Sequence, residues 1–186
     1  MRFQHFTHLR VEEDLGHIFS TPDRSIQFER TMDHDRSGAA ERRIEGIFER
    51  VRLEEYPASP SRLSCIFLFE FGLDPDKYAT SMSFIQVRRE LTLVEVETQN
   101  DDLRIARADK SLLSRRRDSK GEFNATDEEI MSDAREYWAG TTKSDYDVEI
   151  LFCGKFIFTR IIRMADQPLD TFSFRERLAR ACDAKN

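Results

Sequence analysis

The segment from Leu63 to Phe71 constrains the fold more than any other part of the sequence, because it is apolar on both of its alternating faces. From Ser64 it reads Ser-Cys-Ile-Phe-Leu-Phe-Glu-Phe, and it follows Pro57 and Pro60, which end the helix-forming segment before it. Successive side chains of a strand point to opposite faces, so a strand that is apolar on both faces is covered on both. The segment therefore predicts a central strand of a buried sheet.

The rest of the chain predicts helices interleaved with further strands. Apolar residues recur at three- and four-residue spacing from Ala39 to Tyr56, and Thr126 and Glu129 form the capping box of a second helix. Shorter helices are expected at Glu12–Phe19, starting at Asp74-Pro75-Asp76 and from Asp170. Strands are expected at Phe3–Leu9, Val148–Cys153 and Phe156–Ile162, and Phe84–Thr98 forms either two strands or one long bent strand. Gly154-Lys155 joins the last two strands, either as a hairpin or within one kinked strand. The fold class is α+β, a mostly antiparallel buried sheet flanked by helices.

Length and composition exclude several classes of protein. With 186 residues, 39% of them hydrophobic, the chain has the size of a single domain spanning residues 1–186. A net charge of −6 excludes a protein that binds nucleic acid through charge over its whole surface. No apolar run approaches the roughly 18 residues of a transmembrane helix, and the N-terminus shows no apolar leader. Three cysteines without a Cys-x-x-Cys pair indicate a reduced, cytoplasmic protein that holds no metal.

The charges are distributed unevenly along the chain. The stretch from Arg104 to Lys120 holds seven basic and two acidic residues, and the stretch from Glu122 to Asp147 holds eight acidic and two basic residues. A local basic run either attracts a nucleic-acid backbone or forms a solvated loop. The candidate nucleic-acid contacts are Arg104, Arg107, Arg115, Arg116 and Arg117.

Several common catalytic motifs are absent from the sequence. It contains no GxGxxG, GxxxxGK[ST], HExxH or GxSxG segment, so Rossmann, P-loop, zinc-protease and serine-hydrolase interpretations have no support. Three short segments remain as candidates for a functional site: His5-Phe6-Thr7-His8, Pro60-Ser61-Arg62 and Asp147-Val148-Glu149.

Glu149 carries the most weight among these candidates. It stands where an apolar strand begins, so alternation turns its side chain inward or toward the mouth of a cleft, unless it is simply a solvent-facing residue at the strand end. An inward carboxylate can stabilise a cationic transition state or orient a sugar hydroxyl. Arg62, directly before the central strand, either caps the last carbonyls of the preceding helix or holds a phosphate over the end of the sheet.

The two histidines near the N-terminus cannot share one ligand. His5 and His8 lie three residues apart on the predicted first strand, so their side chains point to opposite faces. Each is either a hydrogen-bonded structural residue or, for at most one of the two, a group that lines a given cleft.

Together these segments resemble the ADP-ribosyltransferase fold, specifically its small bacterial branches. The opening Gln4-His5-Phe6-Thr7-His8-Leu9 is similar to the first strand of DarT-type DNA ADP-ribosyltransferases, in which a His or Arg, one spacer and a Thr or Ser hold nicotinamide and its ribose. The closing Val148-Glu149-Ile150-Leu151 resembles the strand that carries the catalytic glutamate of that group. The middle of the chain, with Tyr56-Pro57-x-x-Pro60-Ser61-Arg62 and Tyr137-Trp138-x-Gly140, resembles a bacterial family of unknown function.

The resemblance implies a mono-ADP-ribosyltransferase that consumes NAD and needs no metal. It assigns the catalytic role to Glu149, nicotinamide contacts to His5, Thr7 and His8, stacking on nicotinamide to Tyr78, and a pyrophosphate contact to Arg62. Asp147 stands two residues before Glu149, where arginine-specific toxins have Glu or Gln, so modification of protein arginines is not expected.

The resemblance also implies a biological role, that of a toxin or phage-defence effector. DNA or RNA would be the acceptor of ADP-ribose, and an antitoxin protein would be a partner. Two alternatives remain open: a catalytically inactive interaction domain on the same fold, and an RNA 2′-phosphotransferase-like enzyme, which needs several arginines and a histidine around a phosphate.

Overall fold

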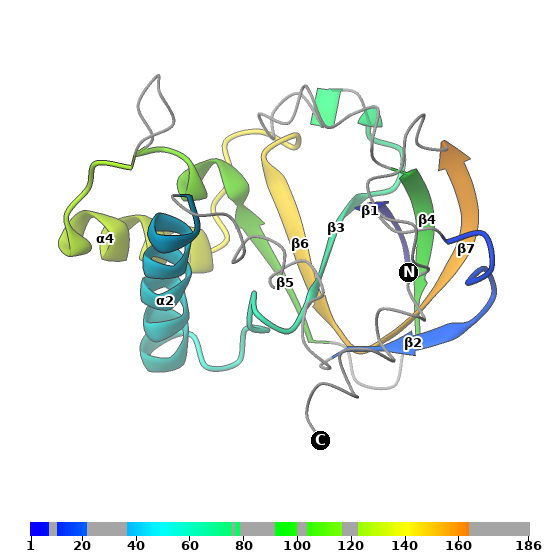
Figure 1. Cartoon of the computed structure of the whole chain (residues 1–186), viewed down its shortest axis with the longest axis horizontal. Helices are drawn as coiled ribbons and strands as arrows, with labels where there is room; N and C mark the ends of the chain where they lie inside the picture. The colour runs from blue at the N-terminus through cyan, green and yellow to red at the C-terminus, as the bar shows by residue number, and fades with distance from the viewer. Residues whose placement is uncertain are drawn as a thin grey trace.

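The computed structural model describes residues 1–7, 11–21, 37–75, 77–78, 92–99, 104–116 and 123–163. In this part of the chain, seven strands form one antiparallel sheet in the order β2-β7-β4-β1-β3-β6-β5 (Figure 1). The strands are β1 (Arg2–Thr7), β2 (Ile18–Ser20), β3 (Ile66–Glu70), β4 (Thr92–Thr98), β5 (Arg104–Asp109), β6 (Val148–Cys153) and β7 (Lys155–Arg163). The apolar segment that predicts a central strand is β3, which lies between β1 and β6.

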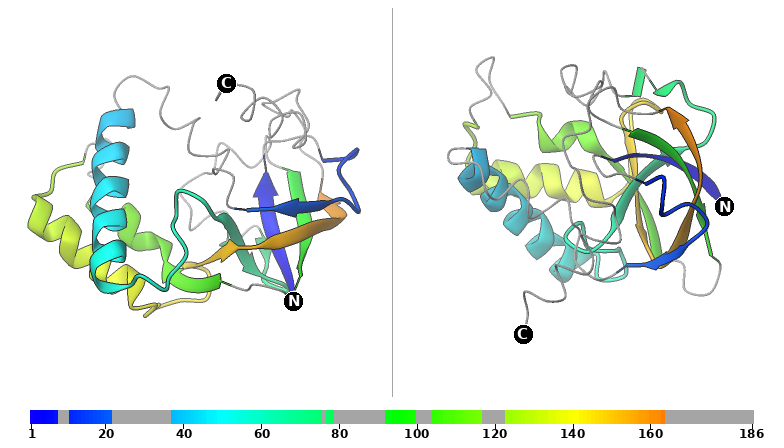
Figure 2. Two further views of the ribbon diagram at one scale, coloured as in Figure 1. Left: turned by 90° about the horizontal axis from the view of Figure 1, so that it is seen from below. Right: turned by 45° about the vertical axis from the view of Figure 1, so that its right-hand side comes forward.

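Two helices, α2 (Ser37–Glu55) and α4 (Asp127–Trp138), lie next to each other beyond the β5 end of the sheet (Figure 2). The predicted capping box opens α4, because Thr126 and Glu129 exchange side-chain and backbone hydrogen bonds. A short 3-10 helix, η3 (Lys110–Leu113), directly follows β5 and contacts α4. Of the helices that the structure describes, none is both long and apolar enough to cross a membrane.

The two faces of the sheet bury different side chains. On one face, strands from both ends of the sheet contribute to a single apolar cluster, in which Phe158 of β7 joins Ile150 of β6. The sheet therefore curves around this cluster (Figure 1). On the opposite face, α2 and α4 cover β5 and β6 through a second cluster that includes Phe48, Ile130 and Leu151. The predicted α+β class, a mostly antiparallel sheet flanked by helices, is confirmed.

The prediction of a helix at Glu12–Phe19 is wrong. Residues 12–16 form a turn, and β2 follows it. Gly16 has a φ of 77°, and its N–H donates to the carbonyl of Phe158 at 2.9 Å. The short apolar run pairs with β7, a distant segment that local periodicity does not reveal.

The segments on either side of Gly154 are joined by a kink and form no hairpin. β6 pairs with β3 and β5, whereas β7 pairs with β4 and β2, so the two strands belong to different parts of the sheet. Of the other expected elements, a helical turn follows Asp74, whose Oδ1 accepts from the N–H of Lys77 at 3.3 Å. The helix from Asp170 and the first half of Phe84–Thr98 lie outside the described residues.

Candidate active site

Glu149 lies on β6 with its side chain on the helix-covered face of the sheet, and it is 7% exposed. Its partner on β5 is Ala108, which belongs to the cluster beneath the helices. The carboxylate oxygen Oε1 accepts hydrogen bonds from the Arg62 guanidinium and from the Tyr137 hydroxyl. Glu149 is therefore an inward, fixed carboxylate, and the solvent-facing alternative does not apply.

Arg62 balances the charge of Glu149. Besides its ion pair with Glu149, its Nε lies 3.0 Å from Oε2 of Glu45 on α2. The guanidinium also lies over the rings of Phe67 and Tyr137, 4.8 and 5.2 Å from their centroids. Burial by itself lowers the pKa of Arg62, but the two carboxylates outweigh burial and raise it well above its ordinary value. The guanidinium thus binds carboxylates, where the sequence suggested helix carbonyls or a phosphate.

Tyr137 is a member of the site that the sequence does not single out, because its position indicates only the inner face of α4. Its ring is buried against Phe48 and Trp138, and its hydroxyl accepts from Arg62 while donating to Glu149. Burial raises the pKa of Tyr137 well above its ordinary value, so the hydroxyl keeps its proton. The signal that could have found it is chemical: a buried tyrosine hydroxyl needs a polar partner.

A second group of polar side chains lies beside Glu149. Tyr78 stacks on Phe69 with ring centroids 4.1 Å apart, and Nζ of Lys110 lies 3.2 Å from the centroid of the Tyr78 ring. Both Tyr78 and Lys110 interact electrostatically with Glu149. Burial lowers the pKa of Lys110 to about 7 and raises that of Tyr78. The structure thus brings Tyr78 close to Glu149 and adds Lys110, which the sequence analysis did not single out.

His5 and Thr7 lie on the other face of the sheet. His5 projects into the apolar cluster, where its ring is nearly parallel to that of Phe158, with centroids 6.4 Å apart. Its Nδ1 lies 2.7 Å from the carbonyl oxygen of Phe67. Thr7 is buried two residues farther along β1 and so shares this face. The structure does not bring these two residues together with Glu149, and the sheet separates their side chains.

Two arginines of the basic stretch pair with the acidic stretch that follows it. Arg115 and Arg116, in the turn after η3, bind Asp133 of α4 at 3.2 and 2.8 Å. Arg115 also binds Glu136 at 2.8 Å. These contacts favour the interpretation of the turn as a structural, solvated loop. Two further predicted residues, His8 and Arg117, lie outside the described part of the chain.

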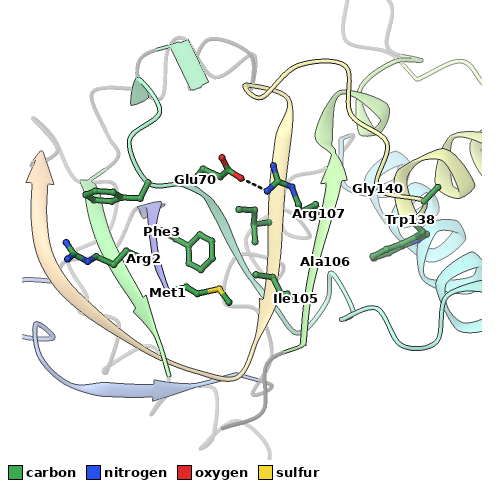
Figure 3. Close-up of a pocket in the computed structure, with 12 residues that line it drawn as sticks. Met1, Arg2, Phe3, Glu70, Ile105, Ala106, Arg107, Trp138 and Gly140 are labelled. Carbon is green, nitrogen blue, oxygen red and sulfur yellow. Dashed lines mark hydrogen bonds and ion pairs between the residues drawn. The ribbon is translucent and has the colours of Figure 1, made fainter. Parts of the chain in front are cut away.

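A groove of about 740 Å³ lies beside β5 and the end of α4 (Figure 3). Arg107 and Glu70 form an ion pair within it, and apolar side chains that include Phe3, Ile105 and Trp138 line the rest. Neither Glu149 nor its partners are among the lining residues. The groove on the surface is therefore separate from the buried cluster of Glu149, Arg62 and Tyr137.

The described residues contain no group of three or more His, Cys, Asp or Glu side chains that could hold a metal ion. Cys65 and Cys153 are free and buried.

Two comparisons with known proteins bear on this site. A family model described as "Protein of unknown function (DUF2441)" matches residues 10–164, a range that includes Arg62, Tyr78, Lys110, Tyr137 and Glu149. No curated protein matches the chain significantly.

Proposed function

The chain belongs to the DUF2441 family of proteins of unknown function, and we propose that it is an NAD-dependent mono-ADP-ribosyltransferase with Glu149 as its catalytic carboxylate. The proposal includes the fold, which we assign to the ADP-ribosyltransferase-like group. One observation carries it: a glutamate on an inner strand of the sheet is buried and held at one carboxylate oxygen by Arg62 and Tyr137.

The chemistry of the reaction requires such a group. When nicotinamide leaves NAD with the electron pair of its glycosidic bond, positive charge develops on the ribose. A carboxylate fixed in a site that excludes water stabilises this charge without first having to reorient. Arg62 supplies the opposite charge that allows a carboxylate to be buried at this position, and a ribose hydroxyl can replace the Tyr137 hydroxyl as its second donor.

The proposal uses part of the set of residues that the resemblance implies. Glu149 is the catalytic residue, and Tyr78 offers an aromatic surface for nicotinamide beside it. Arg62 acts as a positioning residue for Glu149 rather than as a pyrophosphate ligand. His5 and Thr7 face the apolar cluster, and we assign them to the fold and not to the NAD site.

The proposal extends to the acceptor of ADP-ribose and to the biological role. We propose DNA or RNA as the acceptor, and a toxin or phage-defence role in the cytoplasm with an antitoxin as partner. Arg104 on β5 is exposed and remains the first candidate contact to a nucleic-acid backbone, because Arg115 and Arg116 are occupied by α4. Arg107 is exposed as well, but it would have to exchange its ion pair with Glu70 for a phosphate.

The same ion pair also favours a second function, that of a catalytically inactive interaction domain. A carboxylate neutralised by an arginine is a common structural arrangement, and Arg62 binds Glu45 as well as Glu149. The RNA 2′-phosphotransferase alternative has less support, because both described contacts of Arg62 to charged groups are to carboxylates and not to a phosphate site.

The test compares two substitutions that each remove one carboxylate from Arg62. Purified wild type, Glu149→Gln and Glu45→Gln are incubated with NAD labelled in nicotinamide, with and without DNA, RNA and protein, and nicotinamide release is measured. We expect Glu149→Gln to lose at least about 100-fold in rate, as for the loss of one preorganised electrostatic group, and Glu45→Gln to stay within a few-fold of wild type.

Thermal unfolding of the same variants separates a lost reaction from a lost fold. The proposed activity is refuted if wild type shows neither nicotinamide release nor an NAD-dependent thermal shift with any acceptor. The role of Glu149 is refuted if wild type and Glu149→Gln turn over NAD equally fast. Toxicity on expression that Glu149→Gln relieves would support the toxin role.

A further inference from the structure

Strand β5 forms one end of the sheet, and its outer edge lies beside the groove. In the described part of the chain, β5 pairs only with β6. The groove extends around the outer edge, because Ile105 and Arg107 line it on one side of β5 and Gly140 lines it on the other (Figure 3). A six-residue edge strand with unpaired backbone groups is a template on which another chain can pair.

The backbone groups that face outward belong to Ile105 and Arg107. Directly after β5, the N–H of Lys110 donates to the carbonyl of Asp147 at 2.9 Å, in register with the pairing of β5 and β6. Backbone groups alternate in direction along an antiparallel strand, so the even-numbered residues of β5 face β6 and the odd-numbered residues face away. Among the described residues, the N–H and C=O of Ile105 and the N–H of Arg107 therefore have no hydrogen-bond partner.

The end of α4 closes the edge beyond Arg107. A Cβ atom on Gly140 would lie 3.0 Å from the carbonyl oxygen of Arg107, so the chain passes very close to β5 at this glycine. Gly140 also has a φ of 72°, a conformation that other residues rarely adopt. The open edge thus runs from Arg104 to the N–H of Arg107, and it accommodates about four residues of an added strand.

The two faces of this edge present different side chains. Ile105 is 40% exposed and points to the groove, whose lining includes the buried side chains of Phe3 and Ile150. Arg104 points to the opposite face, is exposed and has no ion pair within the residues that the structure describes. Side chains that lie opposite each other on paired strands interact, so an added strand is favoured when it is apolar beside Ile105 and acidic beside Arg104.

We propose that the edge of β5 from Arg104 to Arg107 binds an extended peptide of a partner protein in which acidic and apolar side chains alternate. The peptide backbone bonds to the open groups of Ile105 and Arg107, an apolar side chain covers Ile105 in the groove, and a carboxylate pairs with Arg104. The interaction is independent of the activity proposed for Glu149, because the groove lies apart from the Glu149 cluster.

Two other occupants fit this edge less well. A nucleic acid, the acceptor proposed above, uses Arg104 but leaves the carbonyl of Ile105 unpaired, and Glu70 in the groove repels its phosphates. A second copy of the chain brings its own β5, whose only carboxylate, that of Asp109, is buried and cannot reach Arg104. An acidic, partly apolar strand satisfies the backbone, the exposed isoleucine and the unpaired arginine together.

The test measures binding of a peptide to the full chain by fluorescence anisotropy. The probe is a labelled hexapeptide of alternating glutamate and valine with blocked ends, and a hexapeptide of alternating lysine and valine controls for charge. Short DNA and RNA strands represent nucleic acids. Ile105→Pro removes an outward N–H, a change that an edge strand tolerates. Arg104→Glu reverses the charge, and Arg50→Glu is its matched control, because Arg50 of α2 is also exposed and without an ion pair in the described part of the chain.

We expect wild type to bind the acidic peptide with an affinity that falls as salt is raised, and to bind the lysine peptide about fivefold more weakly. Ile105→Pro is expected to lose at least about tenfold in affinity, because a hydrogen bond is lost and the proline ring stands in the way of the added strand. Arg104→Glu is expected to prefer the lysine peptide, and Arg50→Glu to follow wild type. Thermal unfolding shows whether each variant is folded.

Hydrogen exchange of wild type tests the edge without any substitution. In the free chain the amides of Ile105 and Arg107 should exchange quickly, and the amide of Ala106, which faces β6, should exchange slowly. Addition of the acidic peptide should slow the exchange of the first two amides and leave that of Ala106 unchanged.

Four results would overturn the inference. They are no binding of the acidic peptide to wild type, equal binding to folded Ile105→Pro, unchanged exchange at Ile105 when the peptide is bound, and tighter binding of DNA or RNA than of the peptide that Arg104→Glu abolishes. Self-association of wild type in sedimentation that Ile105→Pro abolishes would assign the edge to a second copy of the chain instead. Nicotinamide release from NAD is measured separately, so the proposed activity and the peptide site stand or fall independently.

Discussion

Two neighbouring residues of β6, Glu149 and Ile150, lie on opposite faces of the sheet and in different environments. Ile150 joins the apolar cluster that the curved sheet encloses, whereas Glu149 joins Arg62 and Tyr137 on the helix-covered face. The apolar face is stabilised by close packing, which tolerates no missing volume. The helix-covered face also holds an apolar cluster, but the part of it around Glu149, which we call the polar face, is stabilised only as long as each charge keeps its partner. The comparison shows that one strand can carry the core and the candidate site at once.

The largest loss of stability is expected when the cation that neutralises the buried carboxylates of the polar face is removed. Arg62→Met leaves Glu149 and Glu45 without their shared cation, and such a change costs about 3–5 kcal/mol of unfolding free energy. Urea denaturation at pH 7 measures it. The double variant Arg62→Met with Glu149→Leu should recover a large part of the loss, because no unpaired charge remains next to Tyr137. A double variant no more stable than Arg62→Met would show that packing, not charge, dominates this face.

A truncation on the apolar face is expected to lower the free energy of unfolding by a smaller amount, and a second substitution there should not restore it. Leu68 on β3 is fully buried in the apolar cluster, so Leu68→Ala opens a cavity and costs about 3 kcal/mol. A second truncation in the same cluster should add to this loss rather than offset it. The same denaturation experiment checks the value. A cost below about 1 kcal/mol would mean that the sheet relaxes around the cavity and that the contrast between the faces is overstated.

The smallest effect concerns the dependence of stability on pH. The pKa of Lys110 is about 7 in the folded protein, below the value of about 10.4 for an exposed lysine. Between these values the unfolded chain binds more protons than the folded one, so the stability of wild type rises with pH. Relative to Lys110→Met, wild type should gain about 1–2 kcal/mol from pH 7 to pH 9, less than the full linkage because near pH 7 the folded protein still carries part of the proton. Parallel stability curves would contradict this.

Local patterns in the sequence predict the elements of this fold well. The capping box at Thr126, the long helix before Pro57 and the buried central strand all follow from residues close together in the chain. Alternation also offers the inward position of Glu149, although only the structure decides it against a solvent-facing one. The three elements need no knowledge of what lies beside them in space.

The remaining features depend on register between distant segments. The contact of Arg62 with Glu149 spans 87 positions, and no spacing rule connects them. The opposite orientation of His5 and Glu149 depends on how β1, β3 and β6 are aligned, and a shift of one residue would reverse it. Lys110 escapes prediction for another reason: lysine is ordinarily exposed, so only its surroundings reveal that it is buried.

The position of β1 has a kinetic consequence. The first strand of the chain is the middle strand of the sheet, and it joins β4 on one side to β3 on the other. Neither half of the sheet can be closed around it until segments some 65 to 95 residues farther along have been found. Such distant pairings are costly in loop entropy before they are rewarded, so folding should take milliseconds to seconds rather than microseconds. During that time the unpaired backbone of β1, with the exposed rings of Phe3 and Phe6, can pair with the wrong strand.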